Sequence, residues 1–510
     1  MAKRSTAVPF GAVPLDDSSS IPLYRQLYDR LRTAILMGQL TPGTRLPSTR
    51  EMATELGLSR NTLMNAFDQL LAEGYVEGHV GSGTFVSSTL PDDLLEARAS
   101  TKRAVRLHPV GRALSLRGKV LAATPVTVAG PVGKMRPFIP GIPALDEFPV
   151  ALWSRLMAQR WRDLSRGLLN YGAAAGYMPL REAIAAYLGP SRGVQCQPDQ
   201  IVIVSGTQQA LDLAGRILLD AGDRVLVEGY CYAAARAALL GAGACLVPVP
   251  VDEAGLDISA SVAQSAAARM AYVTPSHQYP LGVTMSLPRR LALLDWANRT
   301  QAWVLEDDYD SEYRYVGRPL AALQGLDRGG RVIYIGTFSK VLFPSLRIGY
   351  LVVPPDLVDA FVTARAVVGW CSPAIDQAVL ADFITEGHFT RHIRRMRSIY
   401  ADRQAALIDA LRGNVGGLLE VKPADAGIHL RCSLPDYFDD RAVTREAAEH
   451  GVVAHPLSAF NVGGTGFPRR GLVLGYGAYN VRQIKEAAGK LAVALKTAAR
   501  VSKSLKSHRR

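Results

Sequence analysis

The stretches WVLEDDYDSEYRY, residues 303–315, and RVIYIGTFSKVLFPSLRIGY, residues 331–350, decide the fold. Each contains a short apolar run, 303–305 in the first and 332–335 in the second, which predicts a buried strand. Polar side chains follow both runs: Asp307, Asp308 and Tyr309 after the first, and Thr337, Ser339 and Lys340 after the second. Ligand sites in parallel α/β sheets lie beyond the carboxyl ends of strands. We therefore expect these side chains to meet at one edge of a sheet.

Lys340, Asp307 and Tyr309 offer a particular set of chemical groups. A lysine amine can form a Schiff base, a carboxylate can pair with a pyridinium nitrogen, and a phenol can donate to a phenolate oxygen. Pyridoxal 5'-phosphate (PLP) requires these interactions. The simpler interpretation is a solvated loop, because Asp-Asp-Tyr is a common loop composition and lysines after strands are usually exposed. The rest of the chain decides between the two.

Length and composition limit the class of protein. A chain of 510 residues is expected to hold two or three domains, and a hydrophobic content of 48% is enough for a large core. No apolar run is long enough to span a membrane, and the N-terminus lacks the apolar segment of a signal peptide. The five cysteines form no CxxC pair, which favours a cytoplasmic protein with reduced thiols and no metal site. The net charge of +13 is consistent with a nucleic-acid partner.

Residues 20–88 have the pattern of a winged helix-turn-helix domain. Ser48, with Glu51 three positions later, forms a capping box that predicts a helix start. Apolar residues at helical spacing and short apolar runs predict the remaining elements. The expected order is three helices over 23–36, 49–56 and 60–73, then two short strands at 75–76 and 84–86 around a glycine-rich wing.

The second helix of such a helix pair enters the major groove of DNA with its first residues on base edges and phosphates. Four polar residues occupy that position: Ser59, Arg60, Asn61 and Thr62. Arg45 and Arg50 are placed to contact backbone phosphates. The basic residues gather at the helix starts, which favours a double-stranded DNA partner over a structural three-helix module with solvated charges.

Several motifs in this segment resemble the GntR-type DNA-binding domain. They are PLY at 22–24, GTRLPSTR at 43–50, LSRNT at 58–62 and EGY at 73–75. The resemblance covers the first ordered segment of the chain and implies operator binding. It departs from the family at Met64, where a basic residue usually takes part in base readout.

Residues 89–136 differ in composition from the segments on either side. Between Arg98 and Arg136 the chain has nine lysines and arginines, no acidic residue, and several glycines and prolines. This composition predicts a basic linker between two domains. Its charges are expected to add nonspecific DNA affinity by neutralising phosphates, beyond their role in a tether.

Residues 137–498 alternate between strand and helix patterns. The pattern predicts an α/β domain with a mostly parallel sheet of about seven strands and helices on both faces. A largely helical segment at 357–411 and a smaller C-terminal α+β unit are expected to close the domain. The expected strands lie at 201–204, 224–227, 245–249, 270–274, 303–305, 332–335 and 346–353.

Further residues extend the set around Lys340. Gly206 and Thr207 stand between a strand and a helix start, where backbone N–H groups and the helix dipole can hold a phosphate. Arg347 and Thr337 would add a charge and a hydroxyl to that phosphate. Tyr232 is placed to stack on the ring face. Taken singly, Tyr232 could be a core aromatic and Arg347 an ion-pair partner. The occurrence of all these residues at strand ends favours PLP binding.

Motifs in this domain resemble the fold-type I aminotransferases, and most closely the MocR-type regulators, in which such a domain is fused to a GntR-type domain. They are SGTQQA at 205–210, TPSHQYPLG at 274–282, EDDYD at 306–310 and GTFSK at 336–340. The resemblance implies a PLP-dependent transcription regulator, usually a head-to-tail, domain-swapped homodimer. It also implies that Tyr171 reaches the phosphate of the other subunit's cofactor.

The chain departs from the aminotransferase pattern around the cofactor ring. The segment EGYCY at 228–232 replaces a more usual Asp-Pro-Gly-Tyr-Pro, so that either Tyr230 or Tyr232 could stack on the ring, and Tyr232 is preferred. The asparagine that many aminotransferases place on the ring oxygen is absent from the loop at Tyr279. His277 or Gln278 would have to take its role.

The C-terminal region lacks the arginine that clamps a substrate carboxylate in aminotransferases. Val473 occupies its place, and Arg469 and Arg470 just upstream are the candidates to replace it. Without a clamp, transamination loses an orienting contact.

Two functions remain open at this stage. The first is a transcription regulator that senses PLP, or an amine or amino-acid effector, through Lys340. The alternative is an active PLP-dependent aminotransferase with an accessory DNA-binding domain. The missing clamp and the basic linker favour the regulator. A large domain that never binds PLP is disfavoured by the intact set of cofactor residues.

Overall fold

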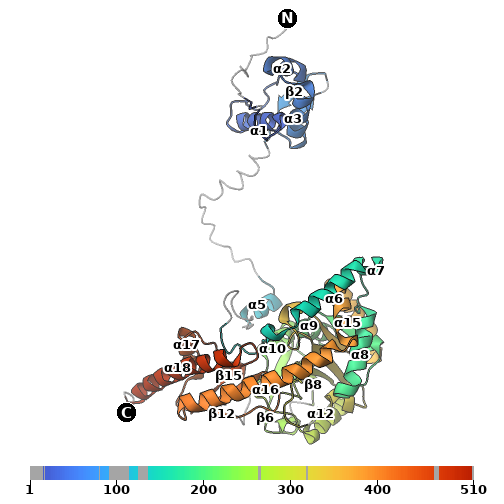
Figure 1. Ribbon diagram of the computed structural model, residues 1–510. Coiled ribbons are helices and arrows are strands. Elements are labelled where there is room, and N and C mark those ends of the chain that lie inside the picture. Colours follow the sequence, from blue (N-terminus) through green and yellow to red (C-terminus); the bar gives the residue numbers. More distant parts are fainter. Residues whose placement is uncertain are drawn as a thin grey trace. The chain divides into compact units, whose positions relative to one another are not determined.

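The computed structural model (Figure 1) describes residues 15–16, 18–79, 81–90, 114–124, 136–261, 266–317, 320–463 and 470–507. The chain divides into two compact units, Met1–Ala113 and Leu114–Arg510. Most of the predicted basic linker, 89–136, lies outside the described residues, as does Val80 in the predicted wing.

The first unit contains three helices followed by an antiparallel strand pair, which confirms the predicted winged helix-turn-helix. The predicted strands are longer than expected at the wing, because the ladder continues from the Val76–Val86 pair to the His79–Gly83 pair. The elements are α1 (Leu23–Leu36), α2 (Thr49–Leu56), α3 (Arg60–Ala72), β1 (Val76–His79) and β2 (Gly83–Val86).

Side-chain caps fix the ends of the short helices in this unit. The Ser48 hydroxyl accepts a hydrogen bond from the Glu51 backbone N–H at 3.2 Å, and the Ser48 backbone N–H donates to the Glu51 carboxylate at 3.0 Å. This is the predicted capping box of α2. Gly57 ends α2 in the left-handed conformation, with φ 65°. Such caps satisfy backbone groups that a helix leaves without intrahelical partners.

A core between α1 and α3 holds the first unit together. Leu31 and Ile35 of α1 and Leu63 and Leu70 of α3 are buried in one apolar cluster. Burying such side chains stabilises a small domain by about 1.5–3 kcal/mol each. The packing fixes the position of α3, whose first two residues, Arg60 and Asn61, are exposed.

The second unit is built on a seven-stranded sheet in the order β3-β11-β10-β9-β8-β4-β5. All neighbours are parallel except β11, which is antiparallel to β10 and to β3. The prediction of a mostly parallel sheet is confirmed. Its strands are β3 (Ile201–Val204), β4 (Arg224–Glu228), β5 (Cys245–Val249), β8 (Ala268–Val273), β9 (Trp303–Asp308), β10 (Val332–Thr337) and β11 (Gly349–Val352).

Both faces of this sheet are buried, as expected for strands that read as continuous apolar runs. Successive side chains of a strand point to opposite faces. In β3, Ile201 and Ile203 therefore lie in one core cluster, while Val202 and Val204 lie in another. Three helices contribute to the first cluster: α6 (Val150–Arg162), α8 (Met178–Arg192) and α15 (Ala374–Thr385). Three contribute to the second: α9 (Thr207–Leu218), α10 (Ala233–Gly241) and α14 (Val358–Gly369). Two pack in a further cluster on the sheet, α12 (Leu287–Thr300) and α13 (Leu323–Leu326), and the short α7 (Arg166–Leu169) has no buried residue.

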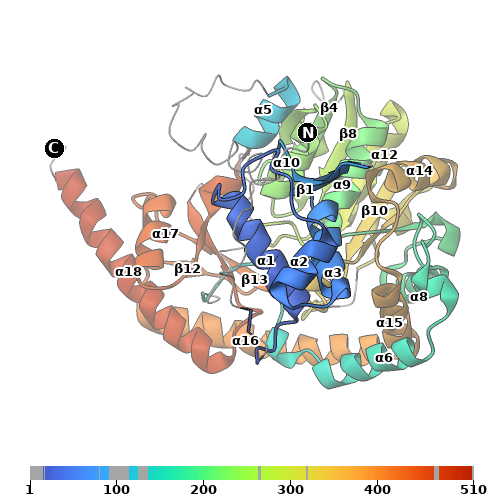
Figure 2. The same cartoon turned by 90° about the horizontal axis from the view of Figure 1, so that it is seen from above.

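A second, four-stranded sheet in the order β12-β13-β15-β14 forms the predicted C-terminal α+β part of this unit. The long helix α16 packs on α18, and α17 lies against α18 beside this sheet (Figure 2). The elements are α16 (His388–Val415), β12 (Glu420–Val421), β13 (His429–Ser433), α17 (Asp440–Glu449), β14 (His455–Pro456), β15 (Gly471–Gly475) and α18 (Val481–Ser507). Across the described ranges, no helix is both long and apolar enough to cross a bilayer.

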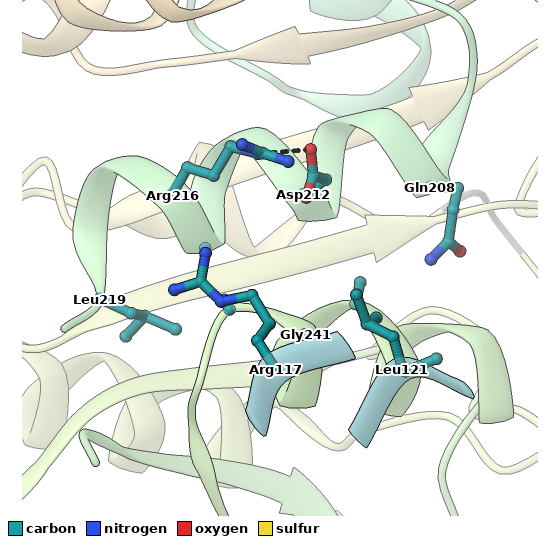
Figure 3. A pocket seen from close by; sticks show the side chains of 11 residues that line it. Arg117, Leu121, Gln208, Asp212, Arg216, Leu219 and Gly241 are labelled. Atoms are coloured by element: carbon teal, nitrogen blue, oxygen red, sulfur yellow. Dashed lines mark hydrogen bonds and ion pairs between the residues drawn. The ribbon is translucent and has the colours of Figure 1, made fainter. Parts of the chain in front are cut away.

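A helix, α5 (Leu116–Ala123), lies within the segment predicted to be a linker. It packs on α10, and together with α9 the two helices line a cavity of about 550 Å³ (Figure 3). A Cβ atom on Gly241 would lie 2.7 Å from Cδ2 of Leu121, so the glycine permits this close approach. The predicted basic linker over 89–136 therefore contains a helix, α5, whose Leu121 packs against α10.

Candidate cofactor and DNA sites

The carboxyl ends of β9 and β10 bring the predicted residues together. The two strands are parallel, and Ile335 of β10 lies opposite Asp307 of β9. Both strands extend further than predicted, because Asp307 and Thr337 take part in the sheet instead of the loops that follow. Lys340 comes three residues after the end of β10. Its amine is therefore held near the last residues of both strands.

The pleat of β9 separates three consecutive acidic residues. Glu306 accepts hydrogen bonds from the backbone N–H groups of Leu323 and Gln324 at 2.7 and 2.8 Å. Asp308 forms an ion pair of 2.7 Å with Arg192. Because alternate residues point to opposite faces, Asp307 points away from both. The Oδ1 atoms of Asp307 and Asp308 both lack a partner among the described residues, but Asp308 has the Arg192 counter-charge. Asp307 has no such cation on its Oδ2, only the Tyr272 hydroxyl, so Asp307 is the carboxylate that suits a cationic donor of a ligand.

The Asp307 carboxylate is buried and only partly satisfied. Its Oδ2 accepts a hydrogen bond from the Tyr272 hydroxyl at 2.8 Å, whereas its Oδ1 has no partner among the described residues. Burial raises the pKa of Asp307 to about 7. A buried carboxylate oxygen without a donor is costly. The pyridinium nitrogen of PLP is a donor of the required kind, so this residue fits the cofactor.

The Lys340 amine donates a hydrogen bond to the Gly141 carbonyl at 2.8 Å. Burial lowers the pKa of Lys340, and the carboxylates of Asp310 and Asp307 oppose the shift. A lowered pKa increases the fraction of neutral amine, which is the nucleophile in Schiff-base formation. Gly141 has φ +77°, and a Cβ there would lie 2.9 Å from the Lys340 Nζ.

The turn before α9 has the geometry of a phosphate cradle. Gly206 is the N-cap of α9 with φ +112°, and Thr207 begins the helix. A Cβ on Gly206 would lie 3.6 Å from a nitrogen of Arg347, so the guanidinium stands beside the helix start. Arg347 is exposed and forms no hydrogen bond or ion pair within the described part of the chain. A cation and a free helix N-terminus at one place suit an anion.

Thr337 and Ser339 add hydroxyl groups at the end of β10. The Thr337 hydroxyl accepts a hydrogen bond from the Ser339 backbone N–H at 3.2 Å. The buried Ser339 hydroxyl has no partner in the residues that the structure describes. Ser339 was not among the predicted site residues, although its position next to Lys340 in the GTFSK motif was a usable signal.

Tyr309, His277 and Asp310 form a hydrogen-bonded group at the same edge. The Tyr309 hydroxyl and the Asp310 carboxylate both lie 3.0 Å from Nδ1 of His277. Because a carboxylate can only accept, Nδ1–H donates to Asp310, which leaves the Tyr309 proton for another acceptor. The His277 ring lies 4.8 Å from that of His429, and the atoms of His277, Asp310 and His429 are close enough for a metal ion. The hydrogen bond to Asp310 accounts for the His277 contact without one.

The sequence left two alternatives open: Tyr230 or Tyr232 to stack on the cofactor ring, and His277 or Gln278 to contact its oxygen. The Gln278 amide donates to the Glu228 carboxylate at 3.0 Å and to the Tyr230 carbonyl at 2.6 Å, so it is occupied. His277 keeps an unpartnered Nε2 among the described residues. Tyr230 is buried in the apolar cluster around Val473. Tyr232 is half-buried, and the charges of Asp307 and Arg347 both act on it. These placements favour His277 and Tyr232.

The missing carboxylate clamp is not replaced by Arg470. Its guanidinium donates to the backbone carbonyls of Asp436, at 2.7 Å, and Phe438. The expectation that Arg470 replaces the clamp therefore lacks support, because its donors serve the loop before α17. Arg469 lies outside the described residues. Val473 is completely buried in β15.

Tyr171 makes no hydrogen bond or ring contact with the other predicted cofactor residues within the described part of the chain. It follows α7, is 84% exposed, and makes an edge contact with Trp370 at 6.2 Å between ring centroids. This exposure suits a residue whose partner is another molecule.

The first turn of α3 presents the predicted DNA-contacting residues. The Ser59 hydroxyl accepts from the Thr62 backbone N–H at 3.1 Å and lies 2.8 Å from the Thr62 hydroxyl, so both residues serve the helix start. Arg60 and Asn61 are exposed and remain for base edges and phosphates. Arg50 is also exposed, on α2. Arg45 is exposed at the wing, where a Cβ on Gly83 would lie 3.0 Å from its Nε.

Comparisons with known proteins agree with this architecture. Residues 23–86 match the bacterial regulatory proteins of the gntR family, and residues 146–474 match the aminotransferases of class I and II. The chain is 44% identical over 474 residues to the probable rhizopine catabolism regulatory protein MocR of Rhizobium meliloti, covering 92% of this chain and 93% of that protein. It is 33% identical over 466 residues to the pyridoxine biosynthesis regulator PdxR of Corynebacterium glutamicum, covering 91% and 93%. The α-aminoadipate aminotransferase LysN of Thermus thermophilus superposes with a TM-score of 0.67 at 29% identity, over 77% of this chain and 97% of that one.

Fold and comparisons together define a class: a helix-turn-helix DNA-binding domain joined to a domain of the PLP-dependent aminotransferase fold. The chain belongs to the MocR type of GntR transcription regulators. It is a DNA-binding regulator whose second domain is aminotransferase-like.

Proposed function

We propose that this regulator binds PLP at Lys340 and responds to the cofactor, or to an amine or amino acid that reaches it, by changing its binding to double-stranded DNA. When bound, PLP supplies an electrophilic carbon and an electron-withdrawing ring. The protein supplies binding, orientation and charge. Lys340 forms the covalent link, Asp307 pairs with the ring nitrogen, and Tyr309 and His277 hold the ring oxygen. Tyr232 covers the ring, and the phosphate is held by Gly206, Thr207, Thr337 and Arg347.

The unpartnered Oδ1 of Asp307 is the observation that carries this proposal. A domain that binds no cofactor would lose nothing by having an apolar residue there, whereas a buried half-satisfied carboxylate lowers its stability. Arg347, without a partner in the described residues beside the start of α9, gives independent support at the phosphate end. The LysN structure was solved with a phosphopyridoxyl-leucine adduct, which is consistent with this type of site in the fold.

The regulator is favoured over an aminotransferase with an accessory domain. The MocR and PdxR relatives, which match more than nine-tenths of this chain, are named as regulators. The apolar Val473 at the clamp position also removes a contact that orients substrates for turnover. In this proposal the ligand at Lys340 shifts the population of domain arrangements, and thereby the spacing of two α3 helices on DNA.

Reconstitution with PLP tests the cofactor part directly. Purified protein incubated with PLP and then gel-filtered is expected to keep a visible absorption band that is displaced on adding an amine. A colourless protein after gel filtration contradicts cofactor binding and leaves the DNA-binding assignment of the first unit intact.

Asp307→Asn is expected to stabilise the cofactor-free protein at pH 8 and to weaken its PLP affinity. Burial raises the pKa of Asp307 to about 7, so the destabilising anion is present above pH 7 and disappears as the pH falls towards the ordinary carboxyl range. The variant removes an uncompensated buried charge, worth on the order of 1–3 kcal/mol at pH 8. Thermal unfolding at pH 5 and pH 8, with PLP titration, measures both effects.

Asp308→Asn is the matched control for this variant. Asp308 is ion-paired with Arg192, so its replacement leaves a buried guanidinium without its counter-charge and is expected to destabilise the protein at both pH values. A destabilised Asp307→Asn variant that binds PLP as tightly as the wild type contradicts the assigned role.

We also propose that the protein acts as a domain-swapped homodimer in which Tyr171 reaches the partner's cofactor phosphate. Its 84% exposure supports a role in another subunit's site. Its ring contacts the exposed Trp370 at the end of α14, and Leu169, two residues before it, is exposed as well. Contiguous exposed apolar surface is typical of an interaction site.

Mixing two defective variants tests the contribution of Tyr171. Tyr171→Ala is expected to weaken PLP binding, and Lys340→Ala is expected to abolish the covalent band. A mixed dimer of the two contains one site with an intact lysine and an intact tyrosine, supplied by different chains. Co-expression should therefore restore about the affinity of one wild-type site per dimer, read by absorbance titration. No restoration in isolated mixed dimers contradicts the swapped arrangement.

A further inference from the structure

The start of α3 uses some of its polar side chains within the protein and leaves others for DNA. The Ser59 hydroxyl accepts from the Thr62 backbone N–H and lies 2.8 Å from the Thr62 hydroxyl, so both residues are engaged in the helix cap. Asn61 and Asn65 are exposed, and their amides form no side-chain hydrogen bond within the described residues. Together with the exposed Arg60, these two amides are the polar groups that the first two turns of α3 present to a partner.

An apolar side chain stands in the middle of this exposed face. Met64 is 42% exposed, and it does not belong to the apolar cluster that holds the described part of the first unit together. Successive residues of an α-helix are turned by about 100°, so Met64 lies one turn after Arg60, at an angle between Arg60 and Asn61. Leu63 and Leu70 point to another side of the helix, into the core with α1. Packing within this unit therefore does not account for a methionine at this position.

The major groove of DNA contains one apolar group that suits such a side chain. Every base pair presents hydrogen-bond donors and acceptors there, and thymine adds its 5-methyl group. A methionine that covers polar base edges removes water from them and offers no hydrogen bond in return, which is unfavourable. Against a methyl group the same side chain buries apolar surface, and its unbranched, flexible chain adjusts to its neighbour. Asparagine forms paired hydrogen bonds with adenine, so Asn61 and Asn65 on the same face also suit A·T base pairs.

We infer that Met64 contacts the 5-methyl group of a thymine in the operator and thereby specifies an A·T base pair at that position. This contact depends on the DNA-binding role of the first unit and is independent of PLP binding at Lys340. Arg60, one turn before Met64, supplies charge towards the DNA, whereas Met64 supplies base discrimination without any charge. The two residues therefore have separable effects on affinity, on salt dependence and on base preference.

Removing the thymine methyl groups from the DNA tests this contact without changing the base pairing. A fragment from upstream of the protein's own gene is amplified once with dTTP and once with dUTP. The affinity of the full-length protein for each product is then measured by fluorescence anisotropy at one salt concentration. The wild type is expected to bind the uracil-containing DNA about 4-fold more weakly for each methyl group that Met64 contacts, which corresponds to the burial of one methyl group.

Met64→Ala is expected to bring the ratio of the two affinities close to one, because it removes the apolar contact and leaves Arg60 and both asparagines in place. Met37→Ala is the matched control. Met37 is 74% exposed at the end of α1, outside the reading helix, so this variant should keep the wild-type ratio. Thermal unfolding of each variant shows whether its fold is kept.

Met64→Arg provides a second test that depends on a gain of preference. An arginine pairs with O6 and N7 of guanine, so the preferred base at the Met64 position is expected to change from thymine to guanine. Duplexes in which each position of the bound sequence is randomised in turn measure this change.

Equal affinities of the wild type for thymine and uracil DNA overturn the inference. So does a Met64→Ala variant that keeps the wild-type ratio, or a Met64→Arg variant with unchanged base preference at every position. Failure of the proposed PLP site looks different, because the protein would then be colourless after incubation with PLP while these DNA ratios keep their expected values.

Discussion

Lys340→Ala is expected to lose the visible band completely while keeping its fold and its affinity for DNA. The lysine is the only covalent attachment in the proposed site, whereas Asp307, Tyr309 and Arg347 provide noncovalent contacts. Removing the covalent link leaves PLP free to dissociate during gel filtration. Removing the side chain also frees the Gly141 carbonyl from its 2.8 Å hydrogen bond, which is a small cost at a partly accessible position.

The measurement combines absorbance after gel filtration with far-UV circular dichroism. Lys422→Ala, which removes an exposed lysine of the same unit, is the control and should keep the band. A Lys340→Ala variant that retains a band of wild-type intensity contradicts the covalent role. A variant that loses both the band and its helix signal would be replaced by Lys340→Arg, which keeps the size and charge without forming the link.

Arg60→Ala is the second variant with a large expected effect, and it acts on the other unit. Arg60 is the first residue of α3 and is exposed, with its helix held by the Ser59 cap. Loss of one such contact costs about 1–3 kcal/mol, or roughly 10- to 100-fold in affinity for the operator. The PLP band should be unchanged, because Arg60 belongs to a separate compact unit.

Fluorescence anisotropy on DNA from upstream of the protein's own gene measures this effect at several salt concentrations. A phosphate contact would reduce the salt slope by about one, whereas a base contact would relax sequence preference. Arg299→Ala removes the same charge from α12, where the arginine forms an exposed ion pair with Asp295. If Arg60→Ala and Arg299→Ala weaken binding equally, the loss reflects net charge and α3 is not the reading helix.

The central sheet could be predicted from the sequence because each of its strands is a short, continuous apolar run. All seven apolar runs became strands, and β9 and β10 were anticipated together with the polar residues at their ends. The two strands continue through Asp307 and Thr337, which were expected in loops. Polar residues usually end a buried strand, but here the ladders continue: Asp307 lies opposite Ile335 of β10, and Thr337 lies opposite Gly349 of β11.

Other parts of the site depend on contacts that periodicity does not reveal. His429 of β13 is far from Lys340 in the sequence, and its place beside His277 follows from the packing of the small sheet. The Asp310 contact with His277 joins two loops, although both residues stood in quoted motifs. The helix α5 was not predicted, because the basic composition of the segment indicated a linker. The contact between Leu121 and Gly241 could not be inferred from that composition.

The central claim is that occupation of the Lys340 site changes DNA binding. The most direct test is the affinity of the PLP-loaded protein for its own upstream DNA, measured with and without an amino acid that displaces the visible band. We predict a change in affinity for the wild type at ligand concentrations that displace the band, and no change for Lys340→Ala, which should still bind the DNA. The same affinity for wild type with and without ligand, or an equal response in Lys340→Ala, would contradict the account.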